Sequence, residues 1–334
     1  MGESRLAQRS GLGSNLRYPQ PDRRMTAPIL ALALTIDALL GEPDWLWRRL
    51  PHPAALMGRL IGNLDRRFNR PPAARRNGIA VAAALAVSAA TLGWLIHLIP
   101  DYGILETLTV AILLAQRSLV DHVRDVARGL RRSLVDGKAA VALIVGRDIA
   151  PMRKADVARG AIESAAENLS DGVIAPAFWY LVLGLPGLLV YKMANTADSM
   201  VGHLTPRHRD FGWASARWDD LLNLVPARLT ALLIALTHGW RDPRPVLRDA
   251  PKHRSPNAGW PESVLAPVLD VALAGPRSYG GAVTDYPWVW PEGRRDPGAD
   301  DIDAACAALW RTWAGMLALV TLLALTCPTC APLF

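Results

Sequence analysis

Residues 78–99 read GIAVAAALAVSAATLGWLIHLI and decide what kind of protein this sequence encodes. The run holds 22 residues without Asp, Glu, Lys or Arg. At a rise of about 1.5 Å per residue, a helix of that length crosses the hydrocarbon core of a bilayer. A second run, AALWRTWAGMLALVTLLALT at 307–326, carries a formal charge only at Arg311, near one end. The sequence therefore predicts a multi-pass membrane protein.

The charges around this span predict its orientation. A second apolar segment, 104–116, follows a connecting tip, PDYG at 100–103, that has an acid and no Lys or Arg. Both feet of this hairpin are basic, with eight arginines between 48 and 76 and ten Lys or Arg residues between 117 and 159. Cytoplasmic loops carry the excess of Lys and Arg. We therefore expect the tip outside the cell and the stretch 117–171 on the cytoplasmic side.

The other apolar segments do not have the sequence of simple membrane-spanning helices. The segment 27–40 is short and carries an aspartate. Residues 172–191 are uncharged but contain two prolines and three glycines, so the sequence leaves open a broken, a re-entrant or a kinked span. The segments 229–240 and 264–275 are too short to cross alone.

The stretch AIESAAENLSDGVIAP at 161–176 stacks carboxylates on one helical face. Glu163, Glu167 and Asp171 follow one another at intervals of four residues, with Asn168 beside them. Like charges at this spacing repel by roughly 0.2–0.5 kcal/mol per pair on an isolated helix. We therefore expect a cation to bind at this edge of the membrane.

Four more polar clusters combine carboxylates with amides and cations. They are VGRD at 145–148, NTADSM at 195–200, ARWDDLLNLVPAR at 216–228 and SPNAGWPES at 255–263. Carboxylates suit Mg²⁺, which keeps several waters and binds phosphates, and arginines clamp phosphate oxygens. Any one such residue is more often a solvated helix end or half of an ion pair. Five clusters around one apolar element favour a metal–phosphate site, because ionisable groups at membrane depth are costly.

Other function classes lack their sequence signals. The net charge of +7 comes from arginines beside apolar runs, which fit anionic lipid headgroups and not a nucleic acid. The sequence contains no HExxH, GxxxxGK[ST] or GxSxG motif, so any ATP is bound without a standard nucleotide motif. Three cysteines give no disulfide framework, and the Cys327–Cys330 pair has no second pair to complete a zinc site.

The same stretches carry a family resemblance. They are LLGEPDWLWRRLPHPAALMGRLI at 39–61, GRD at 146–148, AIESAAENLSDGVIAPAFWYLVLGLPG at 161–187, NTADSMVG at 195–202, FGWASARWDDLLNLVPAR at 211–228 and SPNAGWPES at 255–263. In these residues the chain resembles the adenosylcobinamide-phosphate synthases of cobalamin biosynthesis, which are integral-membrane proteins. The departures are Ala197, His203 and Trp218, where Leu, Tyr and Leu are expected.

The resemblance implies ATP-dependent amide formation. The substrates would be adenosylcobyric acid and (R)-1-aminopropan-2-ol O-phosphate, or free aminopropanol. ATP would activate a propionate carboxylate, as an acyl phosphate, and the amine would attack it. This chemistry needs Mg²⁺ on the nucleotide, cations on the transferred phosphoryl group and a base for the ammonium group.

We assign these roles to the polar clusters. The catalytic carboxylates are Glu163, Glu167, Asp171, Asp198, Asp219 and Asp220, with the first four as Mg²⁺ ligands and one of the six as the base. The phosphate-binding residues are Arg147, Lys192, Arg217 and Arg228. The residues that orient the ligands are Asn168, Asn195 and Asn223.

We expect an all-α fold with about four to six membrane-embedded helices, some of them broken or re-entrant, and cytoplasmic helical segments. A single membrane-embedded catalytic domain should span 25–326, between a disordered extension at 1–24 and a short tail at 327–334. The protein should lie in the inner membrane with its site facing the cytoplasm. Its expected partners are the corrinoid, aminopropanol phosphate, ATP and membrane lipids, without nucleic acid. Association with a second copy or with other corrinoid-pathway enzymes is left open.

Two alternatives remain at this point. A membrane-embedded, Mg²⁺-dependent prenyl- or alcohol-phosphate transferase would use similar Asp and Asn motifs, but would need a lipid substrate and no ATP turnover. A non-catalytic corrinoid transport or assembly component would bind corrinoid without turnover, and would leave the stacked carboxylates without a purpose.

Overall fold

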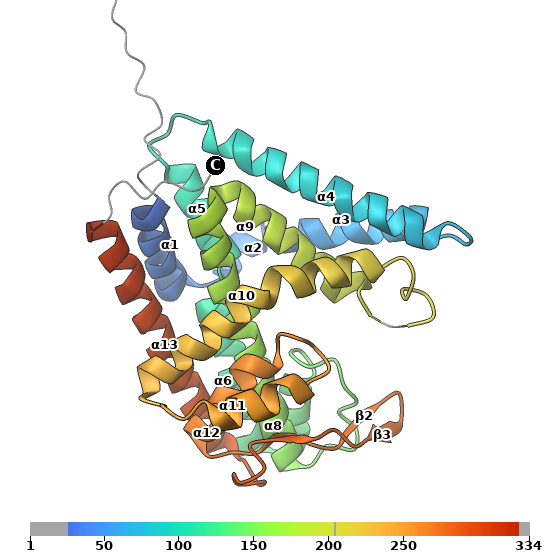
Figure 1. Ribbon diagram of the computed structural model, residues 1–334, viewed down its shortest axis with the longest axis vertical. Helices are drawn as coiled ribbons and strands as arrows, with labels where there is room; N and C mark the ends of the chain where they lie inside the picture. Colours follow the sequence, from blue (N-terminus) through green and yellow to red (C-terminus); the bar gives the residue numbers. More distant parts are fainter. Residues whose placement is uncertain (1–25, 204, 327–334) are drawn as a thin grey trace, which may run out of the picture.

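The computed structural model describes residues 26–203 and 205–326, and almost all of its regular structure is helical (Figure 1). Within these residues, the helices long and apolar enough to cross a membrane number 4. They are α4 (Ala74–His97), the continuous helical stretch Lys154–Val201, α10 (Trp213–His238) and α13 (Ala299–Thr326). The predicted all-α, polytopic membrane fold is confirmed. The extension at 1–24 and the tail at 327–334 lie outside the described residues.

Apolar side chains on the spans remain exposed on the outside of the bundle. They are Ile79, Val87, Leu92, Trp94 and Leu95 on α4, Leu221, Val225, Leu232 and Leu236 on α10, and Leu319, Leu322, Leu323 and Leu325 on α13. In water this surface would be unfavourable at about 25 cal/mol per Å². The same surface is stable against lipid, which fits the assignment of these helices as spans.

The second limb of the predicted hairpin is shorter than a span. Helix α5 (Ile104–Leu113) ends at Leu114, whose backbone is extended, and α6 (Gln116–Arg132) starts directly afterwards. The residue before α6 is an alanine, which cannot cap a helix. Instead Oδ2 of Asp37, on α1 (Thr26–Leu40), accepts a hydrogen bond from the Gln116 backbone N–H at 2.9 Å. The aspartate in the short apolar segment therefore caps a distant helix.

The long helical stretch contains the two irregularities that its prolines dictate. Pro176 has no N–H, and the helix widens into a π-turn, η1 (Ser170–Ile174), between α8 (Lys154–Leu169) and α9 (Ala175–Val201). Further on, Gly184 adopts φ 65° and ψ −158°, two residues before Pro186. There α9 bends sharply, and its second limb returns beside α4 (Figure 1). The predicted break in this element is confirmed.

Helix α10 corrects an expectation. The segment 229–240 was expected to be too short to cross the membrane, but the helix begins at Trp213 and reaches span length. The charged motif at 216–228 forms its first half and continues into the apolar half without a break. Asp219 and Asn223 on it are buried, so the polar residues are absorbed on the inner side of the helix.

The polar elements gather at the opposite end from α4 (Figure 1). They include α7 (Leu134–Val141), α11 (Arg244–Asp249), the 3-10 turn η2 (Ala250–Lys252) and α12 (Gly259–Leu269). Two small antiparallel sheets follow, pairing β1 (Leu273–Ala274) with β4 (Trp288–Val289) and β2 (Arg277–Tyr279) with β3 (Ala282–Thr284). The two remaining short elements are α2 (Asp44–Trp47) and α3 (Pro53–Phe68).

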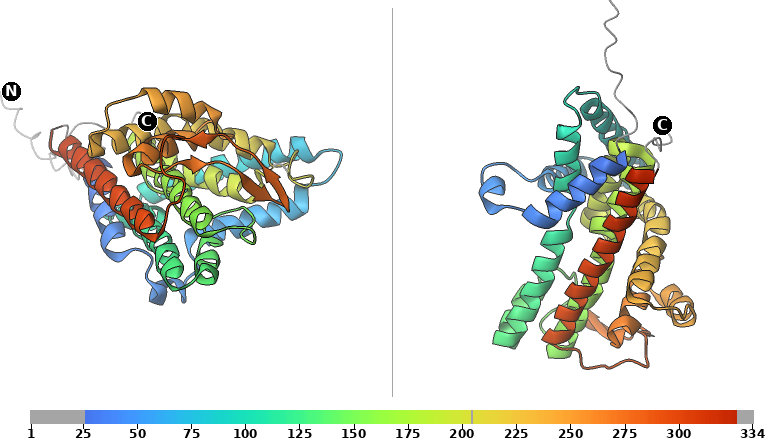
Figure 2. Two further views of the ribbon diagram at one scale, coloured as in Figure 1. Left: turned by 90° about the horizontal axis from the view of Figure 1, so that it is seen from below. Right: turned by 90° about the vertical axis from the view of Figure 1, so that its left-hand side faces the viewer.

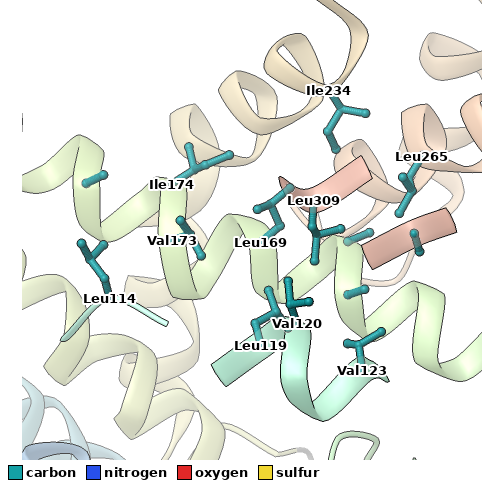
Figure 3. Close-up of a cluster of buried hydrophobic side chains, with 14 of the residues drawn as sticks. Leu114, Leu119, Val120, Val123, Leu169, Val173, Ile174, Ile234, Leu265 and Leu309 are labelled. Carbon is teal, nitrogen blue, oxygen red and sulfur yellow. The ribbon is translucent and has the colours of Figure 1, made fainter. Parts of the chain in front are cut away.

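The buried core lies where the spans meet these polar elements. Helix α6 buries Leu119, Val123, Val126 and Leu130, a stripe at helical spacing, and lies beside α13 (Figure 2). Figure 3 shows part of this helix, Leu119, Val120 and Val123, in one cluster with side chains from α8, η1, α10, α12 and α13. Burying each such aliphatic side chain stabilises the fold by about 1.5–3 kcal/mol. This core holds α8, η1 and α10 together next to the candidate site.

Candidate active site

The π-turn leaves one backbone carbonyl without a helical partner. The Ala175 N–H donates to the Ser170 carbonyl, five residues back, and Pro176 has no N–H to offer. The carbonyl of Asp171 therefore has no donor from its own helix. The hydroxyl of Tyr191, from the second limb of α9, lies 3.1 Å from it. A proline in the first limb thus creates an acceptor that the second limb satisfies.

From this point a closed ring of hydrogen bonds runs through η1, α9 and α10. The Tyr191 hydroxyl also lies 3.0 Å from Oδ1 of Asn223, whose Nδ2 donates to Oδ2 of Asp219 at 3.1 Å. Asn195 Nδ2 donates to Oδ1 of Asp219 at 3.2 Å and to Oδ2 of Asp171 at 3.4 Å, which closes the ring. Two amides and a phenol therefore fix the orientation of two carboxylates inside the helix bundle.

Further charges surround this ring. Asp171 interacts electrostatically with Glu167 and Lys192, and Asp219 interacts with Asp198 and Asp220. Lys192 also lies close to Asp37. Glu167 is exposed although the residues before it on the helix are buried. The site is thus a group of acidic side chains with one half-buried lysine, Lys192, and Glu167 is exposed at its edge.

Glu163 lies in a different environment from the rest of the acidic stack. Its carboxylate accepts hydrogen bonds from Arg147, in the loop after α7, and from the Ala274 backbone N–H at 2.6 Å. Arg277 on β2 approaches it to 3.3 Å. The expected three-carboxylate face is therefore divided. Glu163 is neutralised by two arginines, Asp171 belongs to the ring, and Glu167 lies between them.

The remaining predicted residues lie around these two groups. Asn168 Nδ2 donates to the Ser164 carbonyl at 2.9 Å, so this amide is fixed by its own helix. Arg217 is exposed, with Nη1 3.4 Å from Asp220. Arg228 stacks on the Trp260 ring, with its guanidinium carbon 4.4 Å from the ring centre. Arg228 therefore joins α10 to α12 and does not reach the ring of hydrogen bonds directly.

Comparison with known proteins identifies the family. The sequence model described as "CobD/Cbib protein" matches residues 30–309, which is most of the chain. The chain belongs to the CobD/Cbib family. No solved structure matches it.

Three curated relatives of this CobD/Cbib family member carry the name cobalamin biosynthesis protein CobD. The one from Sinorhizobium sp. is 52% identical over 301 residues, covering 84% of this chain and 93% of the relative. The one from Brucella suis biovar 1 is 47% identical over 310 residues, covering 87% and 95%. The one from Rhodobacter capsulatus is 43% identical over 306 residues, covering 89% and 97%. The family and these relatives support a role in cobalamin biosynthesis.

Oxygen ligands for a hard cation are present in this CobD/Cbib family protein, but they do not form a closed metal site. Among the described residues, no group of three or more His, Cys, Asp or Glu side chains is placed to hold a metal ion. Mg²⁺ is usually held by one or two carboxylates together with waters and substrate phosphates. The donors around the ring, Asp171, Asp219, Glu167 and Asp198, therefore fit a cation that arrives with a phosphate ligand.

Sequence reasoning missed three residues of this site. Tyr191 lies in an apolar run and gave no signal there. Arg277 lies 114 positions after its partner Glu163, and spacing along one chain cannot join them. Glu262 lies in the polar cluster SPNAGWPES, but the sequence alone assigns it no functional role. It is 2% exposed, and burial, with the nearby Glu163 charge, raises its pKa well above the ordinary value.

Proposed function

We propose that the chain catalyses ATP-dependent amide formation in cobalamin biosynthesis. It would join a propionate carboxylate of adenosylcobyric acid to (R)-1-aminopropan-2-ol O-phosphate, giving adenosylcobinamide phosphate, or to free aminopropanol. Family membership supports the pathway, and the ring of hydrogen bonds through Asp171 and Asp219 is the observation that carries the chemistry. A ring that fixes two carboxylates beside the half-buried Lys192 suits an enzyme that binds a metal–nucleotide complex.

Mg²⁺ would be held by Asp171 and Asp219, with Glu167 and Asp198 close by. When bound, it would neutralise charge on the nucleotide phosphates. Asn195 and Asn223 orient the two ring carboxylates, and Lys192 offers its charge to a phosphoryl oxygen next to Asp171. Glu163 is left out of the proposed Mg²⁺ ligands, because two arginines and a backbone amide already contact its oxygens.

Glu167 lies between the ring and the arginine-bound Glu163, and its side chain is exposed. An amine bound on that side would meet an activated carboxylate bound on the ring side. Glu167 is therefore our candidate for the base that takes a proton from the ammonium group, after which the amine nitrogen can attack. Holding both reactants next to Glu167 would bring the amine close to the activated carboxylate and make the reaction effectively intramolecular.

We place the protein in the inner membrane with the site facing the cytoplasm, where ATP is available. The basic stretches on both sides of α4 support this orientation. The residues of the ring come from η1, the second limb of α9 and the first half of α10. The arginines that contact Glu163 come from the polar elements at one end of the bundle.

Two experiments test the function. A strain lacking the protein should accumulate cobyric acid and should grow on a cobalamin-dependent pathway when supplied with cobinamide. Growth on cobyric acid as readily as on cobinamide would exclude this step. The purified protein in detergent should form the amide only with ATP and Mg²⁺, releasing one nucleotide product per amide. Corrinoid binding without turnover would indicate a transport or assembly component, and turnover of a lipid phosphate without ATP would indicate a transferase.

A further inference from the structure

Glu262 on α12 is a buried carboxyl with one oxygen unused. Its side chain is 2% exposed, and its Oε2 atom has no hydrogen-bond partner within the part of the chain that the structure describes. The other oxygen, Oε1, lies 3.8 Å from Nε2 of His253. Buried polar atoms are almost always paired, so an orphaned carboxylate oxygen indicates a missing partner.

Among the described side chains around Glu262, none supplies that partner. Its charged neighbours are Glu163, Glu167, Arg147 and Arg277. Both arginines already contact Glu163. The two glutamates repel a second carboxylate and cannot donate to it when ionised. In the unliganded protein the raised pKa keeps Glu262 protonated and uncharged. A cation from outside the chain would stabilise its ionised form, with release of that proton, because a buried charge is stable only when paired.

His253 lies on the Oε1 side of Glu262, at a distance too long for a hydrogen bond. The Ser255 backbone N–H donates to Nδ1 of His253 at 3.0 Å, so the neutral ring carries its proton on Nε2, which faces Oε1 of Glu262. Burial lowers the pKa of His253, which favours that neutral ring. Oε2 therefore remains as an acceptor.

The missing cation is better matched by an ammonium group than by a metal ion. A divalent metal needs several oxygen ligands at short distance, and among the described residues no such group is assembled. An alkylammonium group needs one deep acceptor and can direct its other N–H donors to an exposed carboxylate. Glu167 is exposed and its charge acts on Glu262, so it is such a carboxylate.

We propose that Oε2 of Glu262 binds the ammonium group of the amine reactant, with Glu167 at the open side of the same subsite. This inference rests on the proposed amide-forming function. It divides the site into a metal–nucleotide half around Asp171 and Asp219 and an amine half around Glu262. Glu167 stands between the two halves, where the amide bond forms.

The test compares Glu262→Gln with the matched control Glu292→Gln, which changes an exposed glutamate paired with Arg248. Kinetics in detergent should show the KM for (R)-1-aminopropan-2-ol O-phosphate rising about 10- to 100-fold in Glu262→Gln, the loss expected for a charge-assisted hydrogen bond. The KM for ATP should change less than about twofold, because uniform binding of the other substrate is untouched. Glu292→Gln should leave both values unchanged.

Ligand-induced stabilisation gives a readout that does not depend on turnover. Aminopropanol phosphate should raise the melting temperature of the wild type but not that of Glu262→Gln. Propane-1,2-diol phosphate, which lacks the ammonium group, should affect both proteins alike. Glu262→Asp, which retains the charge but is one methylene shorter, should fall between the two and covers the case in which the glutamine variant does not fold.

The outcomes separate this inference from the function itself. If Glu262→Gln retains the wild-type KM for the amine and is stabilised by it as the wild type is, the orphaned oxygen holds only an ordered water and the inference is wrong. If the wild type forms no amide at all, the proposed function is wrong, and the melting comparison still shows whether Glu262 binds an ammonium group.

Discussion

The phenolic oxygen of Tyr191 lies 3.0 Å from Oδ1 of Asn223 and 3.1 Å from the carbonyl oxygen of Asp171. One hydroxyl therefore joins the π-turn, the second limb of α9 and the first half of α10. Two amides hold the Asp219 carboxylate, and one of them, Asn223, is itself held by this hydroxyl. The backbone irregularity created by Pro176 is in this way connected to the orientation of the candidate metal–phosphate site.

Removing this hydroxyl should affect activity more than stability. Tyr191→Phe keeps the buried ring but removes the one hydroxyl proton that the Asp171 carbonyl and Asn223 Oδ1 share. The loss of the hydrogen bond should lower the free energy of unfolding by about 1–3 kcal/mol. Activity at limiting Mg²⁺ should fall about 10- to 100-fold, as is typical when a group that orients metal ligands is removed. The measurements are thermal melting and amide formation as a function of Mg²⁺ concentration.

Tyr180→Phe is the matched control for that variant. Tyr180 is also on α9 and fully buried, and its hydroxyl donates to Oε1 of Glu106 at 2.7 Å, outside the ring. It should lower the melting temperature without changing the Mg²⁺ concentration needed for half-maximal activity. Equal Mg²⁺ dependence in the two variants would mean that Tyr191 stabilises the fold and does not orient the site.

A close helix contact makes a second prediction. A Cβ atom added at Gly93 on α4 would lie 2.7 Å from the Cα atom of Pro186, at the bend of α9. The atoms nearest to this Cβ all belong to the α9 backbone, so Gly93→Ala must push the two helices apart. Overpacking of this kind costs about 1–3 kcal/mol. Its melting temperature in detergent should fall. Gly298→Ala, which has no neighbour within 4 Å of its Cβ, should leave the melting temperature unchanged.

The orientation of the chain is tested by cysteine labelling at two exposed positions. Tyr102, in the tip after α4, is 95% exposed, and Val135, on α7, is 75% exposed. In a background with Cys327 and Cys330 replaced by serine, an impermeant maleimide should label Tyr102→Cys in intact spheroplasts. Val135→Cys should react only after lysis, because we expect the basic segments around it to face the cytoplasm. Labelling of position 135 before lysis would reverse the topology.

The sequence was sufficient to predict the spans that consist of one apolar run. Helices α4 and α13 were recognisable because length and the absence of charge need no knowledge of the rest of the chain. The break near Pro186 was recognisable for a similar reason, since proline acts on its own helix. Helix α10 was not, because Asp219 and Asn223 interrupt its apolar pattern and only the packed structure shows that they face inward.

The contacts between distant elements could not be predicted from one sequence. The spacing of Glu163, Glu167 and Asp171 indicated a shared helical face, which is a local property. Whether each carboxylate meets a cation or an amide depends on Arg277 and Asn195, which belong to other elements. The sequence therefore indicated which residues to consider as a site, whereas their division into two groups required the tertiary structure.

That division gives the last prediction, which contrasts two identical changes four residues apart. Glu163 is buried between Arg147 and Arg277, so Glu163→Gln removes the carboxylate that contacts both guanidinium groups. Removing one partner of a buried ion pair typically costs about 3–5 kcal/mol. Glu163→Gln should therefore lower the melting temperature strongly, and the activity lost should follow the fraction of folded protein.

Glu167→Gln should show the opposite combination, with stability kept and activity lost. Glu167 is exposed, is attracted by Arg277 and is repelled by the like charges of Glu163 and Asp198. Neutralising it removes these repulsions together with the attraction, so the unliganded protein should be about as stable as the wild type. Amide formation should nevertheless fall by at least about 100-fold if Glu167 acts as the base. Melting and turnover measured on the same purified samples decide the matter. A destabilised Glu167→Gln with normal activity per folded molecule would remove Glu167 from the site.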